Sequence, residues 1–88
     1  MPARHDPATH VRFAFFREGR LTSLPSRSSY RLAALGVLAE RFEPGHRYPE
    51  REVTAILADD APDPATLRRL LVDHGLLSRA AGEYWRDR

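Results

Sequence analysis

The sequence predicts a small α+β, mostly helical domain, and three features of its second half carry this prediction. Residues 63–75 have the caps and apolar periodicity of a helix, and residues 49–57 have those of a shorter helix before it. Residues 76–86 contain two short extended runs around a glycine-containing loop, which indicates a β-hairpin. Helix, turn, helix and hairpin are typical of a winged-helix-like domain, with a three-helix helix-turn-helix core and a C-terminal hairpin.

The N-terminal region is expected to hold an arm and a short helix. Residues 1–8 contain two prolines and no apolar periodicity, so we expect a flexible arm followed by a single domain at residues 9–88. The aromatic-rich stretch that follows the arm predicts a short helix with Val11 and Phe15 on one face. Because Val11, Phe13 and Phe15 also alternate with other residues, a strand remains the alternative.

The most regular helical pattern lies at residues 30–42. A break at residues 18–19 and an extended segment at residues 20–25 separate it from the N-terminal helix. The serines of residues 26–29 offer hydroxyl groups that could cap it. Its apolar residues recur at spacings of three and four, as in a helix that packs one stripe on a core: Leu32, Leu35, Leu38, Ala39 and Phe42.

The segment after this helix leads into the helix-turn-helix. Residues 43–45 contain a proline and a glycine that end the helix. Residues 46–48 form an extended link, which we expect to pair with the C-terminal hairpin as the first strand of a three-stranded sheet. A proline opens the helix at residues 49–57, and residues 58–62 are long enough only for a turn.

The second helix of the pair has a cap at each end. Asp63 can accept hydrogen bonds from the free amides of the first turn, and Pro64 suits the first helical position. Gly75 can supply a left-handed stop. One face of the helix is expected to point to the core, with Leu67, Leu70, Leu71 and His74, and the other outward, with Ala65, Arg69 and Val72.

The periodic apolar positions together predict the core. A chain of 88 residues without cysteine has no disulfide framework, so this core must stabilise the fold. The predicted core residues are Phe15, Leu32, Leu35, Leu38, Phe42, Val53, Ile56, Leu57, Leu67, Leu70, Leu71, Leu76, Leu77 and Trp85.

Charge and hydropathy limit the partners. All 14 basic residues are arginine, and the basic surplus lies at residues 12–31, with five arginines against one glutamate. This surplus could contact phosphates or an acidic partner, or only face solvent. The longest apolar run, residues 32–39, is far shorter than the roughly 20 residues of a membrane span, and no signal segment is evident. We therefore expect a cytoplasmic protein without a membrane partner.

Patterns for catalysis or metal binding are weak. The histidines lack the three- or four-residue spacing of a helical metal site: His5, His10, His46 and His74. Asp73 and His74 are adjacent on a helix, so their side chains diverge and cannot support a serine nucleophile together. There is no glycine-rich phosphate loop. We expect no enzymatic activity, no cofactor and no metal.

A nucleic-acid site is the sharper hypothesis. Arg68 and Arg69, with Thr66 beside them, lie on the second helix of the helix-turn-helix and could reach guanine edges or phosphates in a major groove. Arg86 is expected to point outward from the hairpin, where it could follow a minor groove. These four residues are the predicted nucleic-acid-binding set.

An ordinary structural role for these arginines is the alternative. Arg69 could pair with Asp73 four residues on, and Arg68 with Glu52 or another carboxylate of the preceding helix. Residues 58–63 also carry three aspartates, and negative charge at the start of the second helix opposes contact with a polyanion.

Four stretches of the chain share the order and spacing of a known family. They are FFREGRLTSLP at residues 15–25, RFEPGHRY and EREV within residues 41–53, LRR, LVD and GLL within residues 67–77, and GEYWR at residues 82–86. Together they resemble the bacterial family called domain of unknown function 2087, over nearly all of the chain beyond the arm. The sequence departs from that pattern at residues 26–29, which carry fewer basic residues, and at Thr54, where asparagine is common.

The resemblance implies a setting in gene regulation, since members occur alone or attached to arsenical-repressor-type winged-helix regulators. We therefore expect a domain of a transcriptional regulator that binds double-stranded DNA through its helix-turn-helix and wing. The alternative is a protein interaction or dimerisation module without direct DNA contact. There, the surface around Val72 and the aromatic N-terminal segment would meet another regulator domain or a second copy, forming a homodimer.

Overall fold

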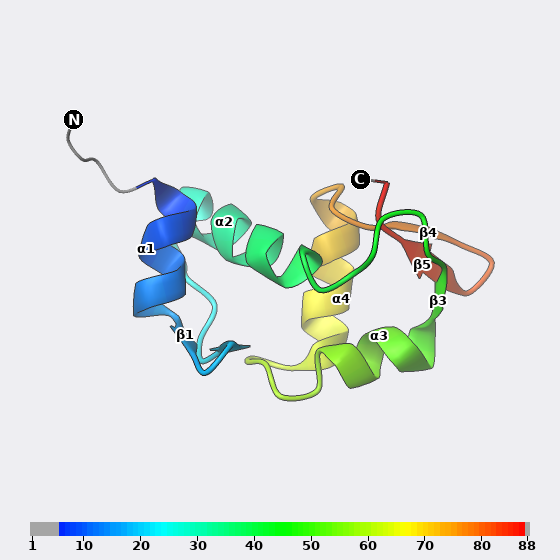
Figure 1. Ribbon diagram of the computed structural model, residues 1–88, viewed down its shortest axis with the longest axis horizontal. Helices are drawn as coiled ribbons and strands as arrows, with labels where there is room; N and C mark the ends of the chain where they lie inside the picture. The colour runs from blue at the N-terminus through cyan, green and yellow to red at the C-terminus, as the bar shows by residue number, and fades with distance from the viewer. Residues whose placement is uncertain (1–5, 88) are drawn as a thin grey trace.

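The computed structural model describes residues 6–87, in which four helices and two small antiparallel sheets follow one another (Figure 1). The helices are α1 (Pro7–Ala14), α2 (Ser28–Ala39), α3 (Glu50–Ile56) and α4 (Pro64–Asp73). The strands are β1 (Phe16–Arg17), β2 (Arg20–Leu21), β3 (Tyr48–Pro49), β4 (Ser78–Ala80) and β5 (Glu83–Trp85). The predicted α+β class is confirmed. Figure 1 shows α1 and β1 at one end, the three-stranded sheet at the other, and α4 between them.

Helix α1 begins earlier than the sequence predicted. The side chain of Asp6 accepts a hydrogen bond from the Thr9 amide at 2.8 Å, and Pro7 occupies the first helical position. The arm expected at residues 1–8 is therefore wrong at its C-terminal end, and residues 1–5 lie outside the described part. The helical interpretation of this segment is confirmed, with Val11 fully buried.

A hairpin that the sequence analysis did not predict follows α1. Strands β1 and β2 pair antiparallel through a two-residue turn in which Glu18 has φ 54° and Gly19 has φ 81°. Two successive left-handed residues give a turn whose twist matches the strands it joins. The turn places Leu21 opposite Phe16 and buries Leu21 at 1% exposure.

Helix α2 differs from the prediction in its cap and its buried face. Arg27 is the N-cap and makes no side-chain cap hydrogen bond, so the predicted serine cap is wrong. Leu35 and Leu38 are fully buried, but Leu32 is 47% exposed. Ala34 is buried in its place, because the buried arc of α2 turns toward α1 on one side and α4 on the other, leaving Leu32 at its edge.

The three-stranded sheet has the order β3-β5-β4, which confirms that the link before α3 pairs with the hairpin. Pro49 is the N-cap of α3 rather than its first helical residue. The hairpin turns at Ala81 and Gly82, both with left-handed backbone. Tyr84 lies opposite Tyr48 on one side and opposite Arg79 on the other.

Helix α4 has the predicted caps. Asp63 accepts a hydrogen bond from the Thr66 amide at 2.8 Å, and Gly75 has φ 74°. The helix buries its leucine side as expected, but His74 is exposed instead of facing the core, and Val72 is half-buried against the core instead of facing outward. The core lies between α2 and α4, so the buried face of α4 is turned slightly toward Val72.

The observed core shares most but not all of the predicted residues. Tyr84 is buried at 2% exposure, and Trp85 is only half-buried, because alternate residues of a strand face opposite sides and β5 turns Tyr84 to the helices. The buried apolar residues are Val11, Leu21, Ala34, Leu35, Leu38, Ala39, Phe42, Tyr48, Val53, Leu57, Leu67, Leu71, Leu77 and Tyr84.

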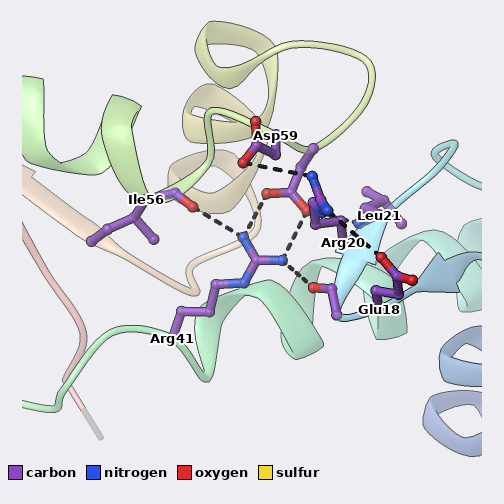
Figure 2. Close-up of polar contacts among 8 residues, drawn as sticks. Glu18, Arg20, Leu21, Arg41, Ile56 and Asp59 are labelled. Atoms are coloured by element: carbon purple, nitrogen blue, oxygen red, sulfur yellow. Dashed lines mark hydrogen bonds and ion pairs between the residues drawn. The ribbon is translucent and has the colours of Figure 1, made fainter.

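An ion pair with a buried carboxylate joins the segment that follows α2, the β1–β2 hairpin and the turn between α3 and α4 (Figure 2). The carboxylate of Asp60, 1% exposed, accepts two hydrogen bonds from the guanidinium of Arg41 and one from the Leu21 amide at 2.7 Å. Arg41 also donates to the carbonyls of Gly19 at 2.8 Å and Ile56 at 3.1 Å. Buried charges are tolerated when paired and hydrogen-bonded in this way.

Candidate nucleic-acid interface

The predicted nucleic-acid-binding residues do not form one cluster. Thr66, Arg68 and Arg69 lie on α4, the second helix of the α3–α4 pair, and Arg86 follows β5. Their exposure and their hydrogen-bond partners differ. Arg68 and Arg69 line a depression together with Arg79 of β4, whereas Arg86 lies in another depression, with Gly36 and Ala39 of α2.

Arg68 is partly buried and is held by protein groups. Its side chain is 21% exposed, donates to the hydroxyl of Thr54 at 3.2 Å, and lies 3.7 Å from a carboxylate oxygen of Glu50. The hydroxyl of Tyr84 donates to the other oxygen of Glu50 at 3.2 Å. The expected pairing of Arg68 with a carboxylate of the preceding helix is confirmed, with Glu50 in place of Glu52. Arg68 therefore links α4 to α3 and β5.

Arg69 is exposed, and within residues 6–87 it has no carboxylate within 4.0 Å. The pairing with Asp73 that the sequence offered as an alternative is therefore not formed. The charge of Arg69 contributes slightly to Asp63, whose pKa is held below its ordinary value of 3.8 chiefly by hydrogen bonds from the amide and hydroxyl of Thr66. The positive charge of Arg69 is thus left to solvent or to a ligand.

Thr66 is exposed but takes part in the cap of α4. Its amide and its hydroxyl both donate to the carboxylate of Asp63, at 2.8 and 2.9 Å. The hydroxyl hydrogen is therefore engaged inside the protein, so Thr66 can meet a ligand only through its oxygen lone pairs and methyl group.

Arg86 does not point outward as predicted. It is half-buried, and its guanidinium donates to the carbonyl of Phe42 at 3.0 Å. Its own carbonyl accepts a hydrogen bond from the Gly45 amide at 2.8 Å. Arg86 shares the strand parity of Tyr84 and so faces the body, which is why the expected orientation is wrong.

A shallow depression of about 160 Å³ lies between α4 and the β4–β5 hairpin. Arg79, exposed on β4, lies over the ring of Tyr84 with its guanidinium carbon 5.7 Å from the ring centre. Like Arg69, it has no carboxylate within 4.0 Å in the described part of the chain. The depression is lined by Arg68, Arg69, Val72, Asp73, Arg79 and Tyr84.

A larger depression of about 400 Å³ lies at the other end, between α1, the β1–β2 hairpin and α2. Its two arginines are already paired. Arg12 donates to both carboxylate oxygens of Glu40, at 2.7 and 2.9 Å, and Arg41 is bound to Asp60. The N-terminal basic surplus is thus partly neutralised within the chain, although Arg17 is exposed and unpaired among residues 6–87.

The described residues offer neither a metal cluster nor a membrane-spanning helix. No group of three or more histidine, aspartate or glutamate side chains within residues 6–87 is arranged to hold a metal ion. No helix in that same part is long and apolar enough to cross a membrane.

Comparison with known proteins identifies one family. The model of a family described as "Uncharacterized protein conserved in bacteria (DUF2087)" matches residues 20–86, which begin at β2 and include every later element. Helix α1 and strand β1 lie outside the match. Neither curated proteins nor solved structures gave a match to this chain.

Proposed function

The chain belongs to the DUF2087 family of uncharacterized proteins conserved in bacteria, and we propose that it is a DNA-binding domain of a transcriptional regulator. The order of elements from α2 to β5 supports a winged-helix-like arrangement: helix, strand, helix, helix, strand, strand. The sheet order β3-β5-β4 pairs the strand before α3 with the C-terminal hairpin, and in a winged-helix arrangement the β4–β5 hairpin would be the wing.

One observation carries the proposal. The second helix of the helix-turn-helix presents Thr66 and Arg69 to solvent, and the charge of Arg69 is not cancelled by an ion pair in the described residues. An arginine in this position can form paired hydrogen bonds to guanine or contact a phosphate. Arg68, which the sequence also assigned to DNA, supports the interface indirectly by fixing α4 against α3 and β5.

The aspartates of the turn before α4 oppose the binding of DNA less strongly than the sequence alone suggests. Asp60 is buried and paired with Arg41, so its charge is largely withdrawn from the surface. Asp63 accepts two hydrogen bonds from Thr66, which spread part of its charge into the first turn of α4. Asp59 remains exposed, with Arg20 at 3.8 Å. Contact with a polyanion is thus opposed by fewer free carboxylates at this end of α4.

Fluorescence anisotropy with a labelled duplex of mixed sequence tests the proposal. We expect binding at about 50 mM salt that weakens as a power of the salt concentration, since bound phosphates release counterions. Arg69→Ala should reduce the slope of log affinity against log salt by about one, because one phosphate contact is lost. Arg17→Ala removes an equally exposed and unpaired charge far from α4 and is the matched control. Equal effects of the two variants, or no binding by the wild type, would contradict the proposal.

A second candidate function is a protein interaction or dimerisation module. The observation that favours it is the exposure of two large apolar side chains, Phe13 at 89% on α1 and Leu32 at 47% on α2. Val72, which the sequence assigned to such a surface, is half-buried and contributes less than expected. Light scattering separates the two candidates: a dimer that ignores DNA and becomes monomeric in Phe13→Ser would favour the second.

A further inference from the structure

We propose that the depression between α4 and the β4–β5 hairpin binds one phosphodiester group of duplex DNA, held between the guanidinium groups of Arg69 and Arg79. This inference rests on the proposed function and deepens it, since it assigns a particular group of the DNA to a particular site. It also adds two residues, Arg79 and Tyr84, to the helix residues that the sequence singled out.

Two unpaired cations line the depression from different elements. Arg69 comes from α4 and Arg79 from β4, and both are exposed. Neither has a carboxylate within 4.0 Å among residues 6–87, so neither charge is satisfied within the described chain. Guanidinium groups suit phosphate, because their parallel N–H groups can donate to two oxygens at once. An anion between the two side chains would receive hydrogen bonds from both.

The base of the depression, formed by Tyr84 and Val72, is partly apolar. Tyr84 is 2% exposed, and the guanidinium carbon of Arg79 lies 5.7 Å from the centre of its ring. Contact with the ring restricts the long side chain of Arg79, so less rotamer entropy is lost when it binds a ligand. Val72, which is half-buried, also lines the depression and adds apolar surface to it.

A network of polar interactions with α3 and α4 holds the side chain of Tyr84 in position. Its hydroxyl donates to Glu50, and Glu50 in turn attracts Arg68, which also donates to Thr54. Because Glu50 offsets the charge of Arg68, this third arginine acts mainly by positioning the ring and α4. Arg68 is therefore bound to protein groups, whereas the guanidinium groups of Arg69 and Arg79 are available to bind a phosphate.

Size and charge both fit a single phosphate. A volume of about 160 Å³ accommodates a phosphate group and a few waters, since one water occupies about 30 Å³ in the liquid. Of the lining residues, three are arginines and one is an acid, Asp73. The carboxylate of Asp73 opposes an anion, so its removal should change affinity in the opposite direction from loss of an arginine.

The test measures duplex binding over a range of salt concentrations. Arg79→Ala should lower the slope of log affinity against log salt by about one, whatever the sequence of the duplex, because a phosphate carries no base identity. Arg79→Lys should restore most of the slope, and Asp73→Asn should tighten binding. Both altered residues are exposed, and thermal melting checks that each variant is folded. An Arg79→Ala slope equal to that of Arg17→Ala would overturn the site while leaving DNA binding by α4 standing.

A titration with inorganic phosphate, followed by NMR of the arginine side chains and the Tyr84 amide, separates the other outcomes. Saturable shifts at Arg79 and Tyr84 that disappear in Arg79→Ala are expected, together with duplex binding. If phosphate binds but the duplex does not, the source is a free phosphate, and both the proposed function and the duplex as ligand are overturned. If neither binds, the depression is not an anion site. A duplex bound without any response at Arg79 or Tyr84 overturns the site alone.

Discussion

Two arginine-lined regions of this protein, one at the turn before α4 and one between α4 and the β4–β5 hairpin, use the same side chain in opposite ways. At the junction before α4, Arg41 is tied to the buried carboxylate of Asp60 and to two backbone carbonyls. In the depression between α4 and the hairpin, Arg69 and Arg79 have no carboxylate within 4.0 Å among the described residues. The two regions differ in whether hydrogen-bond acceptors lie near the guanidinium groups. Arg41 has such acceptors and serves the fold, whereas Arg69 and Arg79 have no carboxylate nearby among the described residues and can bind a ligand.

The physical basis of the difference is desolvation. A carboxylate with 1% exposure, such as Asp60, must be paired, because an isolated buried charge costs several kcal/mol. An exposed guanidinium stays hydrated and costs the fold almost nothing when unpaired. The first region should therefore respond to mutation through stability, and the second through binding.

The largest expected effect is that of Asp60→Ala. Removing this carboxylate leaves the guanidinium of Arg41 half-satisfied and the Leu21 amide without its acceptor, so we expect a loss of about 3 kcal/mol in the free energy of unfolding. Urea denaturation followed by circular dichroism measures it. Arg12→Ala breaks the exposed pair with Glu40 and should cost less than about 1 kcal/mol. Similar losses in the two variants would contradict the expectation that the ion pair of the buried Asp60 contributes more to stability than an exposed ion pair.

Arg68→Ala should have an intermediate effect. This side chain is 21% exposed and joins Thr54 and Glu50 of α3 to α4, so its loss should lower the free energy of unfolding by about 1 kcal/mol. Denaturation in urea measures the loss, with the neighbouring Arg69→Ala as control. A fully stable Arg68→Ala protein would place Arg68 with the open arginines instead of the structural ones.

We expect Asp63→Ala to cause a smaller loss of stability, which depends on pH. The pKa of Asp63 is lowered from 3.8 by hydrogen bonds from Thr66, so its ionised form stabilises the folded state. This contribution is fully present above about pH 4 and is lost as the pH falls through the lowered pKa. The melting temperatures of the wild type and Asp63→Ala should therefore converge in acid. Asp63→Asn, which keeps a capping oxygen but does not titrate, is the control, and its melting temperature should show no such convergence toward Asp63→Ala.

The smallest stability effect is expected for Arg69→Ala. The side chain is exposed and unpaired within residues 6–87, so the free energy of unfolding should change by less than about 0.5 kcal/mol. A change in duplex affinity without a change in stability would sharpen the contrast. A stability loss as large as that of Arg68→Ala would show that Arg69 is also held by the fold.

The sequence by itself determined the elements whose signals are local. The cap of α4 by Asp63, its stop at Gly75 and the turn at Gly82 depend on residues a few positions apart, and the structure confirms them. The pairing of the link before α3 with the hairpin joins distant residues, Tyr48 and Tyr84, and was expected from the order of elements rather than from a local signal; the structure confirms it. Family membership also followed from the sequence, because motif order and spacing need no coordinates.

Only the tertiary structure decided which polar and apolar groups are buried. Asp60 looked like one of several acids in a turn, but its partners Arg41 and Leu21 lie 19 and 39 residues away along the chain. The inward orientation of Tyr84 and Arg86 likewise depends on how β5 sits against the helices. Local patterns set helix starts, stops and turns, whereas burial and charge pairing are settled only when distant segments meet and exclude water.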